Sequence, residues 1–236
     1  MFAQLILSPH VRLAVWIAAG SIFLLVAGTA PRGDDARGVE RGPAGPTTVP
    51  TLPADRGGQD PVGRPLPPLD VDRWLPAEPG APDRPAAGQV TLYRWWTDHC
   101  PFCAKSLPAF ERLRERYAPH GLAVVGVFHP KPPRPTPDHV IRGRAAELGF
   151  RGMLAVDEDW SVLRAIAPTA GRRLPTSMSF LVDATGVVRF VHPGPVLFPS
   201  SDPDHGKENG DFLLLERAIR VLLELPEPTP VPRSPE

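Results

Sequence analysis

The uneven placement of proline most constrains what this chain can fold into. Of its 33 prolines, 13 lie between Pro31 and Pro85 and five follow Leu225. Segments of this composition cannot bury enough apolar surface to offset the entropy that ordering costs. The sequence therefore predicts a disordered, semi-extended linker over residues 31–85 and a disordered tail over residues 226–236. The folded part is confined to one domain over residues 86–225.

The first 30 residues contain a long apolar run. Residues 13–30 carry no charged side chain, and this length lies at the border between a signal-peptide core and a transmembrane helix. We expect residues 1–30 to form an uncleaved signal anchor, with export after cleavage near residues 27–30 as the alternative. The chain would then lie at a bacterial inner membrane with its folded domain facing the periplasm or the outer side, where disulfide chemistry persists.

Charge and cysteine content exclude several classes of function. The formal net charge is zero, and without a basic stripe we expect no nucleic-acid partner. Two cysteines, Cys100 and Cys103, cannot build a disulfide scaffold or close a structural zinc site alone. They leave a redox pair, half of a metal site completed by histidines, or a chance pair. A redox pair of this kind needs no cofactor and no metal.

Hydrophobic patterns predict alternating strands and helices over residues 86–225. The expected order is β-α-β-α-β-α-β-β-α, with Asp211 as the N-cap of the last helix. Such an order is typical of an α/β fold with one mixed central sheet and helices on both faces. The predicted strands cover residues 90–96, 122–128, 153–156, 177–182 and 187–191. The predicted helices run from the Cys100 segment to near residue 119 and over residues 138–148, 160–167 and 211–225.

The Cys-Pro-Phe-Cys segment falls between a predicted strand and a predicted helix. At the N-terminus of a helix, unpaired N–H groups and the helix dipole favour the thiolate of Cys100. Cys103 lies one turn later, where it can attack Cys100 and release a mixed-disulfide partner. Pro101 suits the first helical turn, and Phe102 offers an apolar contact to a partner protein. The segment therefore predicts thiol–disulfide exchange.

Two motifs in this order resemble those of thioredoxin-fold proteins. Residues 96–108 resemble the active-site segment of thiol–disulfide oxidoreductases, and they are most similar to the TlpA/ResA-like extracytoplasmic branch. Leu174-Pro175-Thr176, followed by residues 179–186, resembles the cis-proline segment of the family and the hairpin after it. The resemblance covers residues 86–225 and implies a thioredoxin-like fold, protein thiol or disulfide substrates and a redox partner protein.

The same resemblance assigns roles to further residues. It implies that Pro175 is cis and packs against the disulfide, and that the backbone of Leu174 turns toward the substrate. It also places Trp96 at the active site, ahead of the two cysteines.

Three residues depart from the family's pattern. His99 replaces a tryptophan, Ser106 stands where a glutamate is common, and Arg94 stands where thioredoxin has a buried aspartate. We hypothesise that Arg94 and His99 stabilise the Cys100 thiolate and make the disulfide more oxidising. The alternative is that Arg94 faces solvent. His129 is a candidate proton shuttle at the active-site rim or a surface-loop histidine.

Three competing functions stay open at this point. A copper- or zinc-handling assembly factor would use both cysteines and a histidine. A thiol peroxidase would use one reactive cysteine, which the Cys-x-x-Cys pair argues against. A non-catalytic interaction module would use the long linker as a spacer.

Overall fold

A computed structural model of the chain describes residues 48–168 and 177–226. The predicted signal anchor, residues 1–30, lies outside the described residues. So do Leu174 and Pro175 of the predicted cis-proline segment and residues 227–236 of the predicted tail. Within the described ranges, none of the helices combines the length and the apolar character that crossing a membrane requires.

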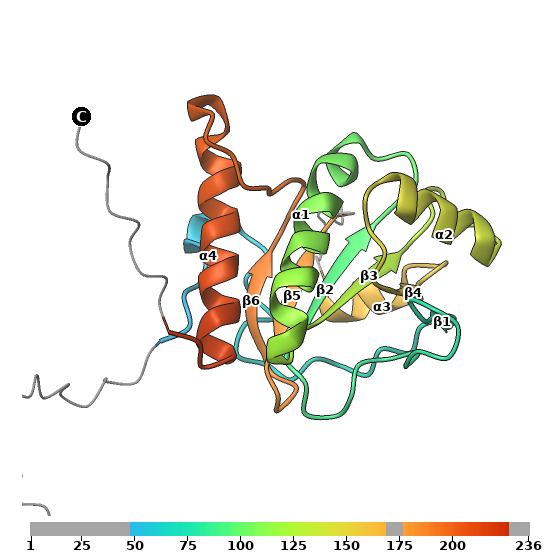
Figure 1. The fold of residues 1–236 in the computed structure, drawn as a ribbon, viewed down its shortest axis with the longest axis horizontal. Coiled ribbons are helices and arrows are strands. Elements are labelled where there is room, and N and C mark those ends of the chain that lie inside the picture. The colour runs from blue at the N-terminus through green and yellow to red at the C-terminus, as the bar shows by residue number, and fades with distance from the viewer. Residues whose placement is uncertain (1–47, 169–176, 227–236) are drawn as a thin grey trace, which may run out of the picture. The chain divides into compact units, whose positions relative to one another are not determined.

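A six-stranded mixed sheet forms the centre of the fold (Figure 1). Its strand order is β1-β4-β3-β2-β5-β6. The middle strands β2, β3 and β4 pair in parallel, whereas β1, β5 and β6 join antiparallel. This mixed sheet confirms the predicted thioredoxin-like α/β fold class. The strands are β1 (Arg73–Leu75), β2 (Thr91–Trp96), β3 (Ala123–Phe128), β4 (Met153–Val156), β5 (Ser179–Val182) and β6 (Val188–His192).

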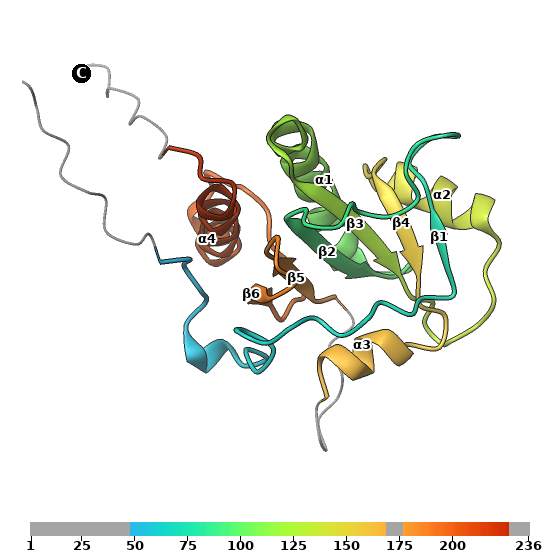
Figure 2. The ribbon, with the colours of Figure 1, turned by 90° about the horizontal axis from the view of Figure 1, so that it is seen from below.

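Helices cover both faces of the sheet, as Figure 2 shows from below. Side chains of α1, α2 and α4 share one buried cluster with the sheet, and side chains of α3 share a second cluster on the other face. The α-helices are α1 (Pro101–Tyr117), α2 (Asp138–Glu147), α3 (Ser161–Ile166) and α4 (Gly206–Leu222), and short 3₁₀ turns occupy Ala54–Arg56, Ala118–His120 and Pro203–His205.

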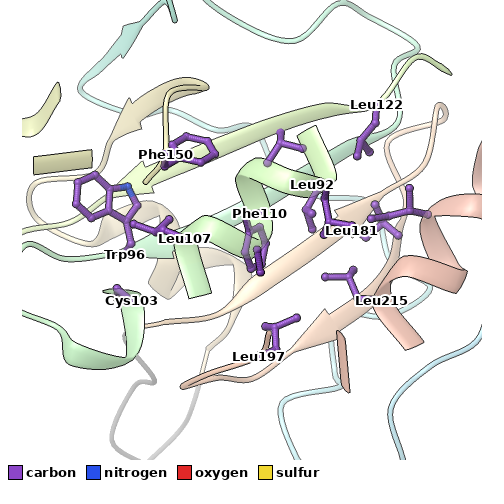
Figure 3. Close-up of a cluster of buried hydrophobic side chains, with 14 of the residues drawn as sticks. Leu92, Trp96, Cys103, Leu107, Phe110, Leu122, Phe150, Leu181, Leu197 and Leu215 are labelled. Atoms are coloured by element: carbon purple, nitrogen blue, oxygen red, sulfur yellow. The ribbon is translucent and has the colours of Figure 1, made fainter. Parts of the chain in front are cut away.

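Strand β2 contributes to both clusters because it is buried along its whole length. Side chains alternate across a strand, so Leu92 and Trp96 face α1 while Tyr93 and Trp95 face α3. Each such side chain contributes about 1.5–3 kcal/mol when it leaves water. Figure 3 shows the first cluster, with Cys103 and Trp96 at one end of it. The redox segment is therefore anchored directly on the core.

Residues 48–85 differ from the predicted disordered linker. Strand β1 pairs antiparallel with β4, Pro65 bridges to Val187, and Leu52 is buried in the first cluster. Leu66 and other apolar residues of this segment pack on the second cluster. The physical reason is that the scattered apolar side chains of this segment can pack on a core face that the rest of the domain already forms. The prolines between these side chains do not prevent that packing. The predicted domain start at residue 86 is therefore too late.

The last helix also begins earlier than expected. A 3₁₀ turn capped by Asp202 leads into α4 at Gly206, so Asp211 lies inside the helix rather than at its N-cap. Asp211 is buried and pairs with His192, 3.3 Å away, and with Arg56, 3.2 Å away. Hydrophobic periodicity missed the first turn of α4 because that turn carries no apolar side chain. His192 is buried at the end of β6.

Candidate active site at the first turn of α1

Cys100 is the N-cap of α1 and Cys103 lies in its first turn. Cys100 has an extended backbone, and its Sγ accepts a hydrogen bond from the backbone N–H of Cys103 at 3.2 Å. Pro101 occupies the start of the helix, where its missing N–H leaves no bond unmade. Both cysteines are free thiols. The arrangement matches the predicted geometry, with two sulfurs one helical turn apart.

The two cysteines differ in their access to solvent. Cys100 is partly exposed, whereas Cys103 is fully buried. Phe102, which lies between them in sequence, leaves 47% of its surface exposed. A macromolecule that approaches this turn therefore meets Cys100 and Phe102 and cannot reach Cys103.

Ser177 is a site residue that sequence reasoning missed. Its Oγ lies 3.7 Å from the Sγ of Cys100 and 3.5 Å from the Sγ of Cys103. The residue is buried and precedes β5. Its only signal in the sequence is its position directly after Leu174-Pro175-Thr176, a motif expected to face the cysteines.

Hydrogen bonding separates the acidities of the two thiols. The bond from the Cys103 thiol is the largest cause that lowers the pKa of Cys100, to about 5; Ser177 and the backbone N–H groups of Cys103 and Phe102 lower it further, against the effect of burial. The same bond to Cys100 and then burial raise the pKa of Cys103, while the charge of Arg94 and the Ser177 hydroxyl oppose that rise. Cys100 is therefore the thiolate of the pair.

Arg94 is buried, which corrects the alternative that it faces solvent. It is 0% exposed, and its guanidinium lies over the ring of Phe110 at 5.3 Å from the ring centroid. Burial lowers the pKa of Arg94, and the charges of Cys103 and then Cys100 oppose that change. The hypothesis placed its charge at Cys100, but the larger interaction is with Cys103.

Unlike Arg94, His99 is exposed to solvent. Its side chain is 82% exposed and its Nε2 lies 3.5 Å from a carboxylate oxygen of Asp98. The same carboxylate forms an ion pair with Arg134. His99 therefore lies on the outer surface of the segment, paired with the residue before it.

The structure also places His129, Trp96 and Ser106. His129 is fully buried, with its ring 5.2 Å from that of Trp160, which corrects the expectation of a surface-loop histidine. Trp96 is fully buried, with its ring 5.0 Å from that of Phe128, so it packs in the core. Ser106, in place of the family's glutamate, donates to the carbonyl of Phe102 at 3.0 Å.

The structure also bears on metal binding. Among residues 48–168 and 177–226, no three His, Cys, Asp or Glu side chains gather closely enough to hold a metal ion.

A comparison with protein families gives one match. The family described as Redoxin matches residues 83–204, slightly more than half of the chain. The matched stretch runs from before β2 to the 3₁₀ turn that precedes α4 and includes both cysteines and Ser177.

Two curated relatives are similar to part of the chain. The protein DipZ of Mycobacterium bovis and that of Mycobacterium tuberculosis are each 29% identical over 150 residues, which cover 60% of this chain and 19% of each relative. The chain thus spans about a fifth of the length of these relatives.

Solved structures are similar in fold. An uncharacterized conserved protein from Geobacillus kaustophilus aligns with a TM-score of 0.51 at 21% identity, over 71% of this chain and 86% of that chain. A thiol:disulfide interchange protein of the thioredoxin family from Chlorobium tepidum aligns with a TM-score of 0.42 at 17% identity, over 58% of this chain and 81% of that chain. The family match and the fold together confirm the predicted resemblance to thioredoxin-fold oxidoreductases.

Proposed function

The chain belongs to the Redoxin family, and from this premise we propose that it is a thiol–disulfide oxidoreductase that exchanges disulfides with protein substrates through Cys100 and Cys103. The observation that carries the proposal is the asymmetry of the pair. Cys100 is the accessible thiolate, and Cys103 is buried one turn away with its N–H on the Cys100 sulfur.

The exchange has two balanced steps. The Cys100 thiolate attacks one sulfur of a substrate disulfide, which releases a substrate thiolate and leaves a mixed disulfide. Cys103 then attacks the Cys100 sulfur, so that the second substrate thiol leaves and the internal disulfide forms. Two electrons and two protons pass from the enzyme dithiol to the substrate. The reverse reaction uses the same groups.

Deprotonation of Cys103 follows from the first step. The hydrogen bond to Cys100 is the largest cause that raises the pKa of Cys103. When Cys100 enters a mixed disulfide, its negative charge disappears and that cause weakens. The Arg94 charge and the Ser177 hydroxyl, which lower the pKa of Cys103, remain. No carboxylate base is required in this account.

The substrate side of the site combines exposed and apolar groups. Pro101 and Phe102 directly follow Cys100 in the chain and are themselves exposed. Pro175 and the backbone of Leu174 complete this side in our proposal. The partners are proteins with a thiol or a disulfide, together with a redox partner protein that restores the starting state.

The proposed location is extracytoplasmic. Residues 1–30 tether the chain to a bacterial inner membrane and leave the catalytic domain on the periplasmic or outer side. The support is the uncharged run over residues 13–30. An alkaline wash of membranes tests the tether: the full chain should stay in the pellet, and a chain that lacks residues 1–30 should be released. Release of the full chain contradicts the tether.

Trapping of the mixed disulfide tests the exchange itself. The full chain with Cys103→Ser should accumulate a covalent complex with a disulfide-containing test protein, because the resolving thiol is gone. The matched variant Cys100→Ser should form none, since Cys103 is buried. Equal trapping by both variants, or trapping by neither, contradicts the proposed roles.

A further inference from the structure

Arg94 is a cation in the interior held by neutral oxygens. Its Nη1 donates to the carbonyl of Ser177 at 2.7 Å and to the Oγ of Ser179 at 3.1 Å, and its Nη2 donates to the carbonyl of Pro195 at 2.7 Å. Ser177 is the residue whose hydroxyl touches both sulfurs. The guanidinium is therefore hydrogen-bonded to the same residue that contacts both sulfurs of the redox pair.

No carboxylate within residues 48–168 and 177–226 forms an ion pair with Arg94. The groups whose negative charge favours the charged guanidinium are Cys103 and Cys100. A buried charge without a counter-charge is costly, and a partner of opposite sign offsets that cost. Negative charge on the redox pair, which Cys100 carries in the dithiol state and Cys103 carries as it leaves the disulfide, is thus the counter-charge of Arg94.

The two redox states supply that counter-ion unequally. In the dithiol state one sulfur is ionised, whereas the internal disulfide is neutral and leaves Arg94 without a negative partner. Any interaction present only in the dithiol state draws the equilibrium toward that state, which makes the disulfide a stronger oxidant.

We propose that Arg94 is a positioning residue that makes the Cys100–Cys103 disulfide an oxidant. The domain would then transfer this disulfide to proteins that carry two reduced thiols. The inference rests on the proposed function and adds the direction of electron flow.

The oxidising step is balanced without another reactant. A substrate thiolate attacks the Cys100 sulfur, the Cys100–Cys103 bond breaks, and Cys103 leaves as a thiolate toward Arg94. The second substrate thiol then attacks the mixed disulfide and releases Cys100. The substrate dithiol is oxidised to a disulfide, and the enzyme disulfide is reduced with two electrons and two protons.

Equilibration of the full chain with glutathione buffers tests the proposal. Arg94→Met removes the charge and keeps an apolar stem, and Arg94→Lys keeps the charge. We expect Arg94→Met to shift the equilibrium toward the disulfide by about tenfold, which equals about 30 mV, and Arg94→Lys to stay within about threefold of the wild type. An Arg94→Met protein that cycles with the wild-type equilibrium constant overturns the inference and leaves the exchange function intact.

A measurement on the wild type keeps the proposal testable if Arg94→Met does not fold. An oxidising disulfide requires the dithiol form to be the more stable one. The full chain as a dithiol should therefore unfold at a higher urea concentration than the same chain as a disulfide, and the opposite order overturns the inference. Failure to form any internal disulfide contradicts the proposed function instead.

Discussion

Removal of one hydroxyl, in Ser177→Ala, should raise the pKa of Cys100. A hydrogen bond to a charged group contributes about 1.5–3 kcal/mol, and one pKa unit corresponds to about 1.4 kcal/mol. The Oγ of Ser177 is 3.7 Å from the Cys100 sulfur, and sulfur is a weak acceptor, so the lower end of that range applies. The pKa of Cys100 should therefore rise by about one unit from its value of about 5.

The pH dependence of alkylation by iodoacetamide measures this shift, because the thiolate is the reactive form and Cys103 is too buried to react. Ser106→Ala is the matched control. It removes a hydroxyl from α1, the helix that carries Cys103, but that hydroxyl donates to the carbonyl of Phe102 and accepts from the N–H of Leu197, and it does not contact a sulfur. An unchanged alkylation profile in Ser177→Ala, or an equal shift in Ser106→Ala, refutes the role of Ser177.

Three further predictions concern stability. Phe110→Ala should cost about 3–5 kcal/mol in urea unfolding because the ring is fully buried, while Leu213→Ala, at an exposed position on α4, should change stability by less than about 0.5 kcal/mol. A chain trimmed to begin at residue 86 should melt well below one that begins at residue 48, since it loses β1 and the cover of the second cluster; equal melting temperatures would refute the packing role of residues 48–85. Burial raises the pKa of Asp183, but bonds from Thr185, Val187 and Arg189 outweigh it and hold the pKa at about 2. This depressed pKa gives stability that is present above pH 4 or so and lost as the pH falls through about 2, so Asp183→Asn should destabilise the protein by about 1–2 kcal/mol at pH 7 and by nothing measurable near pH 2, as urea titrations at both pH values would show.

The elements with clear periodicity were predictable from the sequence. The strand before Cys100, the amphipathic helix after it and the hairpin around Gly186 are where the pattern places them. Local chemistry determines each of them: β-branched and aromatic residues favour the strand, Cys100 and Pro101 favour a helix start, and Asp183 and Gly186 favour a turn.

The remainder depends on contacts that periodicity does not encode. Residues 48–85 are ordered by a core face that forms elsewhere in the chain, so their own composition indicates a linker. The burial of Arg94 follows from three oxygens supplied by Ser177, Ser179 and Pro195. These three residues are distant from Arg94 in sequence. The contact of Ser177 with the sulfurs also joins residues that are distant in sequence, so periodicity does not predict it.

The central claim is that Cys100 and Cys103 form an internal disulfide reversibly. The most direct test is the mass of the full chain after exposure to oxidised glutathione and again after dithiothreitol. We expect oxidation to remove two hydrogens, leave no free thiol and add no stable glutathione, and we expect dithiothreitol to restore both thiols. A chain that retains the Cys103 thiol and carries glutathione on Cys100 would contradict it.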